Sequence, residues 1–167
     1  MPRIPSPKLN VAVHALGLRA DFPDSEIQIG NGWLRWIGYL QPTPISVRYK
    51  VMVEYSGQPR PRVFVLKPAL ELPPGEHRLP HMFDDGAGGL CLHYNHEWDP
   101  RKSIASTIIP WTSEWLLHYE VWLVIGEWTG GGHEPSSPKR PEPHRRQRGD
   151  AGFPSESRVF SNIVEKG

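Results

Sequence analysis

Residues 45–55 read ISVRYKVMVEY, and this stretch decides the fold because its apolar residues fall at every second position. A period of two places those residues on one face of an extended chain and the polar ones on the other. The expected buried face consists of Ile45, Val47, Tyr49, Val51, Val53 and Tyr55. The stretch therefore predicts a β-strand with one face packed against a core.

Two further strands are predicted beside it. WLRWIGYL (33–40) precedes it across the turn Pro42-Thr43-Pro44, and RVFVL (62–66) follows it across the turn SGQPRP (56–61). Short connections between consecutive strands are typical of antiparallel sheets. The three segments together predict an antiparallel meander.

A helical period follows further along the chain. Pro110 suits a first helical turn, where its missing N–H costs nothing. The aromatic residues after it recur at helical spacing on one face: Trp111, Trp115, Tyr119 and Trp122. We expect an amphipathic, Trp-rich helix packed across the meander, which makes the fold class α+β.

Composition divides the 167-residue chain into three parts. The core is expected at 33–133, because all seven tryptophans lie before residue 130. The N-terminal segment, 1–32, has only a short apolar pattern and is predicted as a strand or a short helix. The segment 134–167 is rich in Pro and Arg and poor in apolar residues, so we expect a disordered tail.

Charge and cysteine content limit the function classes. The 19 Lys+Arg nearly balance the 18 Asp+Glu, which gives no bias toward nucleic acid or membranes. We expect no specific nucleic-acid partner, no membrane span, no signal peptide and no cofactor. A single cysteine excludes an internal disulfide and any multi-cysteine zinc site, and it favours the reducing cytoplasm.

That cysteine, Cys91, is the main candidate for chemistry. It lies between Leu90 and Leu92, directly after the sequence DDGAGG (84–89). A buried, inert thiol is the common fate of a lone cysteine. The glycine loop, however, favours a position near the surface. Histidines also surround Cys91 in the sequence, and a cationic or hydrogen-bonding neighbour would lower the pKa of its thiol.

Three chemistries compete for this cluster. A metal site would draw its ligands from His77, His81, Cys91, His93 and His96. A Cys-His hydrolase would need a histidine base and an oxyanion hole. A thioester carrier would need an exposed thiol and a donor for the oxyanion, which backbone N–H groups at 85–89 would supply.

The run from Arg78 to His133 carries a resemblance to a known family. Its parts are a Pro-His turn, a glycine loop, Leu-Cys-Leu, Trp98 and the helix that begins Pro110-Trp111. In this order they resemble the bacterial ubiquitin-conjugating-enzyme-like proteins of antiphage operons. These include the stand-alone conjugating proteins of cyclic-oligonucleotide-based (CBASS) systems. The resemblance covers about residues 33–133.

The resemblance implies a ubiquitin-conjugating-enzyme-like fold and roles for individual residues. Cys91 matches the position that accepts a carboxyl group as a thioester, and His81 resembles the structural histidine of the family's turn. Here the turn reads Pro80-His81-Met82, without the family's oxyanion-stabilising asparagine, and His93 or Asn95 would substitute for it.

The implied partners follow from the same family. They are a cyclic-nucleotide synthase, joined through its C-terminal glycine, and a lysine-bearing acceptor protein in antiviral defence. Two alternatives stay open: a non-catalytic binding module on the same fold, and a Cys/His metal-site protein.

Overall fold

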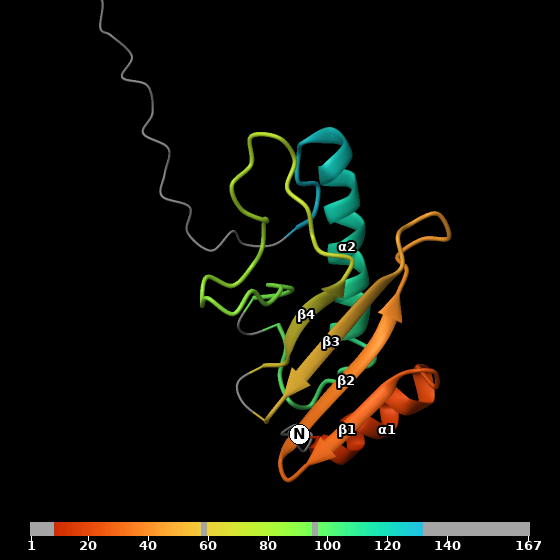
Figure 1. The fold of residues 1–167 in the computed structure, drawn as a ribbon. Coiled ribbons are helices and arrows are strands. Elements are labelled where there is room, and N and C mark those ends of the chain that lie inside the picture. Colours follow the sequence, from red (N-terminus) through yellow and green to blue (C-terminus); the bar gives the residue numbers. More distant parts are fainter. Residues whose placement is uncertain (1–8, 58–59, 95–96, 132–167) are drawn as a thin grey trace, which may run out of the picture. The chain divides into compact units, whose positions relative to one another are not determined.

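The computed structural model describes residues 9–57, 60–94 and 97–131, so the tail predicted at 134–167 lies outside the described residues. The described elements are α1 (Val11–Asp21), β1 (Glu26–Gly30), β2 (Trp33–Leu40), β3 (Tyr49–Tyr55), β4 (Arg62–Lys67) and α2 (Ile108–Ile125). The strands form one antiparallel sheet in the order β1-β2-β3-β4 (Figure 1). The predicted α+β class and the meander are confirmed.

The central strand, β3, begins later than predicted. Its alternating residues from Tyr49 to Tyr55 are buried as expected, but Ile45 is 97% exposed and Val47 is also exposed. The backbone before β3 turns instead of extending, since the Ser46 N–H donates to the Thr43 carbonyl (3.0 Å). The Val47 N–H donates to the Glu120 carboxylate of α2 (2.8 Å). The prediction of a strand from residue 45 was therefore wrong for its first four residues.

The N-terminal segment supplies both a helix and a strand, where the sequence predicted only one of them. Asn10 caps α1, because its side-chain oxygen accepts a hydrogen bond from the Val13 N–H (2.9 Å). β1 then pairs with β2 through a two-residue Asn31-Gly32 turn, in which Gly32 has φ +77°. Asn-Gly is the preferred pair for such hairpins. The meander consequently has a fourth strand.

Helix α2 lies behind the sheet in the view of Figure 1 and packs on its inner face. It begins at Ile108, which leaves Pro110 in the first turn, and it ends at Gly126 in the left-handed conformation (φ 74°). Trp115, Tyr119 and Trp122 of the predicted stripe are buried. The Tyr49 and Tyr119 rings meet edge to face with centroids 6.4 Å apart, so they join helix and sheet.

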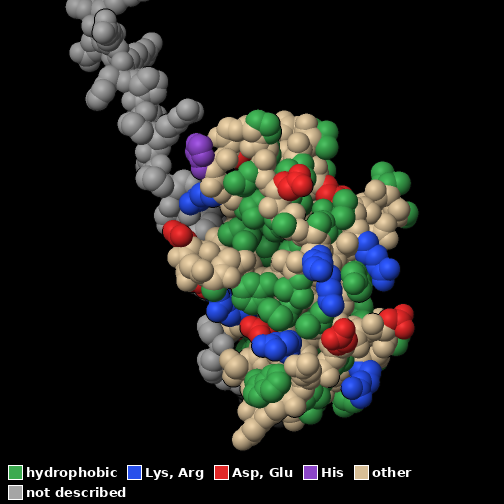
Figure 2. Space-filling model, in the orientation of Figure 1, with side chains coloured by type: hydrophobic (Ala, Val, Ile, Leu, Met, Phe, Trp, Pro, Cys, Tyr) green, Lys and Arg blue, Asp and Glu red, His purple; other side chains and the backbone are tan. Residues whose placement is uncertain are grey.

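The other face of the sheet is not covered by a described helix. Ile37 of β2, Met52 of β3 and Phe64 of β4 are paired in register across it. Figure 2 shows hydrophobic side chains over the strands on this face, with lysines and arginines among them. Across the described residues, no helix is long and apolar enough to span a membrane.

Candidate active site

Cys91 ends a loop whose two ends are joined by backbone hydrogen bonds. The Phe83 N–H donates to the Gly89 carbonyl (2.8 Å), and the Cys91 N–H donates to the His81 carbonyl (2.8 Å). A bridge between Met82 and Leu90 lies between these two bonds. The Leu90 N–H donates to Val63 of β4 (2.9 Å), so the sheet fixes the position of the cysteine backbone.

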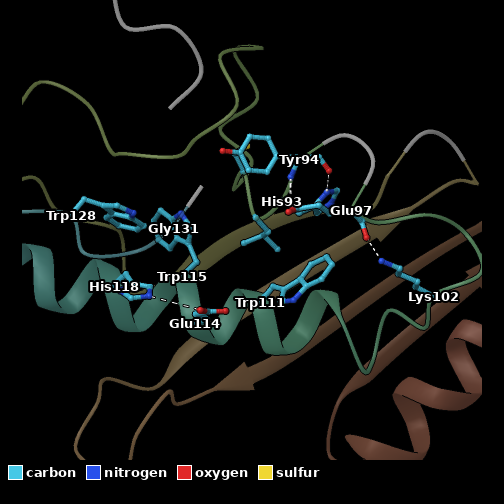
Figure 3. Close-up of a pocket in the computed structure, with 12 residues that line it drawn as sticks. His93, Tyr94, Glu97, Lys102, Trp111, Glu114, Trp115, His118, Trp128 and Gly131 are labelled. Carbon is cyan, nitrogen blue, oxygen red and sulfur yellow. Dashed lines mark hydrogen bonds and ion pairs between the residues drawn. The ribbon is translucent and has the colours of Figure 1, made fainter. Parts of the chain in front are cut away.

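A cleft of about 390 Å³ opens beside Cys91. Its walls come from the segment after the glycine loop, from one side of α2 and from the chain that returns after α2 (Figure 3). The residues that line the cleft include Cys91, His93, Trp111, Trp115, His118 and Trp128. The helix that the sequence predicted to be a core element thus also forms a wall of the cleft.

The thiol of Cys91 is half-buried, and burial raises its pKa above the ordinary value. Two weaker effects oppose burial: the positive charge of Arg60 and a hydrogen bond from the His93 backbone N–H. The expected lowering of this pKa by a neighbouring histidine is present through the His93 backbone, but desolvation outweighs it and the net shift is upward. The resting group at neutral pH is the protonated thiol.

His93 faces the same cleft in a neutral form. Burial is the main cause that lowers its pKa. Its Nδ1 lies 2.7 Å from the Tyr94 carbonyl, which can only accept, so Nδ1 carries the proton. The Nε2 atom therefore has its lone pair available, and His93 can accept a proton.

His81 is hydrogen-bonded to the Cys91 backbone but is not among the residues that line the cleft. Its side chain is buried, and its ring packs on Trp128 with centroids 5.0 Å apart. Its backbone φ of +49° is rare outside glycine and turns its carbonyl toward the Cys91 N–H. The other two residues that the sequence analysis placed near Cys91, Asn95 and His96, lie outside the described residues.

Backbone donors near the cysteine are already engaged in other hydrogen bonds. The Ala87 N–H donates to its neighbour Asp85 (3.0 Å), while the N–H groups of Leu90 and Cys91 are bonded to Val63 and His81. Some of the backbone N–H groups near Cys91 therefore stabilise the loop and are not available to an oxyanion.

Two indole N–H groups in the cleft walls lack an acceptor. The Nε1 atoms of Trp115 and Trp128 are buried and have no hydrogen-bond partner among the described residues. In the sequence, Trp115 falls on the predicted core stripe of the helix, and nothing marks its N–H or that of Trp128 as unpaired. No local pattern reveals it, because it depends on how the chain after α2 folds back over the helix.

Metal binding finds no support in the described geometry. No group of three or more His, Cys, Asp or Glu side chains within the described ranges could hold an ion. His77, one of the candidate ligands, is exposed.

Comparison with known families gives one match. The family E2-CBASS, described as "Type II CBASS E2 protein", matches residues 14–135, which is well over half of the chain. The matched range includes α1 from His14 onward, the whole sheet, the Cys91 cleft and α2. None of the curated proteins matches the chain.

Proposed function

The chain belongs to the type II CBASS E2 family, which gives it an E2-like role in CBASS antiphage defence, and on this basis we propose that Cys91 carries an acyl group as a thioester. The fold would then be of the ubiquitin-conjugating type. The protein would act in the cytoplasm, where reducing conditions keep a lone thiol free.

The reaction has two steps. In the first, the Cys91 thiol loses its proton to solvent and its sulfur attacks an activated carbonyl at the C-terminal glycine of a partner; a C–S bond forms, and the bond from that carbonyl carbon to the activating group breaks as this group leaves with the electron pair. In the second, a lysine amine attacks the thioester, a C–N bond forms and the thiolate departs. The partner is a cyclic-nucleotide synthase, and the acceptor is a lysine-bearing protein.

One observation carries this proposal: the chain's only thiol lines a cleft together with a neutral histidine. The Nε2 atom of His93 is suited to take the proton that the attacking lysine loses. His81 has a positioning role, since its carbonyl holds the Cys91 backbone. Asn95 retains its proposed role as an amide donor to the oxyanion.

The raised pKa of Cys91 fits a carrier better than a hydrolase. A thiolate of high pKa is a poor leaving group, so its thioester is long-lived. The same raised pKa also suits an inert thiol, which keeps a non-catalytic binding module as the second candidate. Reactivity at Cys91 separates the two.

The test uses a donor that needs no activating enzyme. The full chain is mixed with the 2-mercaptoethanesulfonate thioester of N-acetyl-Gly-Gly, and its intact mass is followed over time. We expect a Cys91 acyl adduct that hydroxylamine removes, with a rate that rises with pH beyond neutrality because the thiol must ionise. Cys91→Ala should form none. Acylation no faster than that of the urea-unfolded chain would support the binding module and overturn the carrier.

A further inference from the structure

The two unpaired indole N–H groups of the Cys91 cleft need a partner. Trp115 is 5% exposed, and its Nε1, like that of Trp128, reaches neither water nor an acceptor within the described part of the chain. A buried donor without an acceptor is destabilising, and folded proteins pair the great majority of such groups. Two of them in one cleft suggest that the missing acceptor comes with a ligand.

Other tryptophans of the chain provide a comparison. The Trp98 indole, also buried, donates to the Thr107 hydroxyl at 3.1 Å. The Trp36 indole lacks an acceptor too, but it borders a smaller hollow of about 220 Å³ near Phe22, away from Cys91. Among the described residues, only Trp115 and Trp128 combine an unpaired N–H with the cleft that holds the thiol.

The surroundings hold these two indoles in fixed positions. Their rings lie 5.4 Å apart at an angle of 52°, and His118 packs on Trp128 with centroids 5.9 Å apart. The His118 ring is itself fixed by a contact of 2.9 Å to the Thr129 hydroxyl. Figure 3 shows Trp115, Trp128 and Gly131 grouped at one end of the cleft, and Trp111, His93 and Lys102 at the other.

The chain beside Trp128 is adapted to a close approach. A methyl group at Gly130 would lie 2.8 Å from the Trp128 Nε1, whereas one at Gly131 would meet open space. Glycines also let this backbone yield when a ligand enters. The Gly130 backbone thus covers the Trp128 N–H, and a ligand carbonyl reaches that N–H when this glycine backbone yields.

A donor peptide in this cleft brings the matching acceptors. Its main-chain carbonyl oxygens need hydrogen bonds once they leave water. In the loop beside Cys91, the N–H groups of Ala87, Leu90 and Cys91 are already engaged. Three backbone donors beside the thiol are thus taken, while two indole N–H groups of the cleft walls are unused.

We propose that Trp115 and Trp128 form a carbonyl-binding subsite, in which their indole N–H groups donate to main-chain carbonyl oxygens of the glycine-terminated acyl donor. The inference rests on the proposed function, because it needs an acyl donor in the Cys91 cleft. Such contacts recognise the main chain of the acyl donor and not its side chains. They select an extended chain that ends in small residues.

Kinetics with the N-acetyl-Gly-Gly thioester test this subsite. Trp115→Phe and Trp128→Phe keep an aromatic ring and remove the N–H, and Trp36→Phe is the matched control because it removes an equally unpaired N–H elsewhere. We expect kcat/KM for Cys91 acylation to fall about tenfold in each cleft variant and to stay unchanged in the control. Reaction of Cys91 with methyl methanethiosulfonate, which has no carbonyl, should be the same in all four proteins.

The outcomes separate the two hypotheses. If the wild-type chain is not acylated faster than its unfolded form, the proposed function fails. If it is acylated and the cleft variants react as fast as Trp36→Phe, the subsite is wrong.

A second measurement does not depend on how the variants fold. The indole N–H resonances of the Cys91→Ser protein are followed by NMR during titration with N-acetyl-Gly-Gly amide. We expect the Trp115 and Trp128 signals to move downfield on binding while the Trp36 signal stays in place. Saturation without such a shift would overturn the subsite.

Discussion

Two aromatic clusters in this protein are built from similar residue types but have different roles. The core cluster consists of His14, Tyr55 and Trp98, and the cleft cluster of His118, Trp115 and Trp128. Ring spacing does not distinguish them: Tyr55 and Trp98 are 5.4 Å apart, as are Trp115 and Trp128. The difference lies in the hydrogen bonds and in the space beside the rings.

In the core cluster the Trp98 N–H is paired with Thr107, and Trp98 lines neither of the two hollows described above. One group there does remain unpaired. His14 Nδ1 accepts from the Ile104 N–H at 3.4 Å, which leaves its buried Nε2 N–H without an acceptor among the described residues. In a closed core an unpaired N–H only lowers stability, whereas beside a cleft an unpaired N–H can donate to a ligand.

The largest expected effect lies beside the cleft. His93→Gln should slow the transfer of the acyl group from Cys91 to free lysine about 100-fold, because the proton acceptor is lost. The wild-type rate, divided by the fraction of lysine present as free amine, should hold through pH 6.5 and fall only at lower pH, since the pKa of His93 is lowered and its neutral form persists there. Single-turnover discharge between pH 5 and 8 measures both effects. An unchanged rate in His93→Gln would remove the histidine from the mechanism.

The core cluster should respond in the opposite way. Trp98→Phe should lower the free energy of unfolding by about 2 kcal/mol, because it leaves a void and removes the hydrogen bond to the Thr107 hydroxyl. Urea unfolding measures this loss, and acylation of the folded protein should stay at the wild-type rate. If acylation falls as much as in Trp115→Phe, the two clusters are not functionally distinct.

Lowering the pH should reveal how His14, the unpaired histidine of the core, affects the free energy of unfolding. Burial lowers the pKa of His14, so below pH 6.5 the unfolded chain binds a proton that the folded chain refuses. Stability should therefore fall with decreasing pH by up to about 1.4 kcal/mol per pH unit until the folded-state pKa is reached, and should not depend on His14 above pH 6.5. His14→Gln should flatten this part of the stability curve relative to wild type. The exposed His77→Gln, as the control, should leave it intact.

The smallest effect is expected from a change that leaves the N–H of the core residue Trp98 unpaired, like the N–H groups of the cleft tryptophans. Thr107→Val removes the acceptor of the Trp98 N–H and should cost about 1 kcal/mol of unfolding free energy, measured by thermal denaturation. The indole resonance of Trp98 should not respond to N-acetyl-Gly-Gly amide, because the N–H has lost its partner without gaining a cleft. A response would mean that an unpaired indole alone is enough for binding.

The sequence predicted those parts of the fold that depend on local periodicity. Tyr49 to Tyr55 alternate in the structure as they do in the sequence, and Trp115, Tyr119 and Trp122 share one buried helix face. Ile45 fits the same alternation but lies in a turn, where Glu120 of α2 accepts the backbone N–H of Val47. That contact joins residues 73 positions apart, so no local sequence pattern predicts it.

The candidate site was less predictable, for a related reason. Cys91 stands out as the only cysteine, but its pKa depends on how deeply the folded loop is buried, which outweighs its histidine neighbours in the sequence. Trp115 and Trp128 read as core residues because their side chains are large and apolar. Their unpaired N–H groups result from tertiary packing alone. The hairpin signal Asn31-Gly32 and the cap Asn10, in contrast, were readable and would have revealed β1 and α1.

The hydrogen bond from Leu90 to Val63 has a consequence for the protein's behaviour in solution. β4 is the last strand of the sheet, and an outer strand offers its unpaired backbone groups to any other extended chain. The cysteine loop occupies part of that edge, so the segment that holds the nucleophile also shields the sheet from pairing with a second molecule. Changes that loosen the loop would then promote aggregation as well as inactivation, and soluble yield would report on the geometry around Cys91.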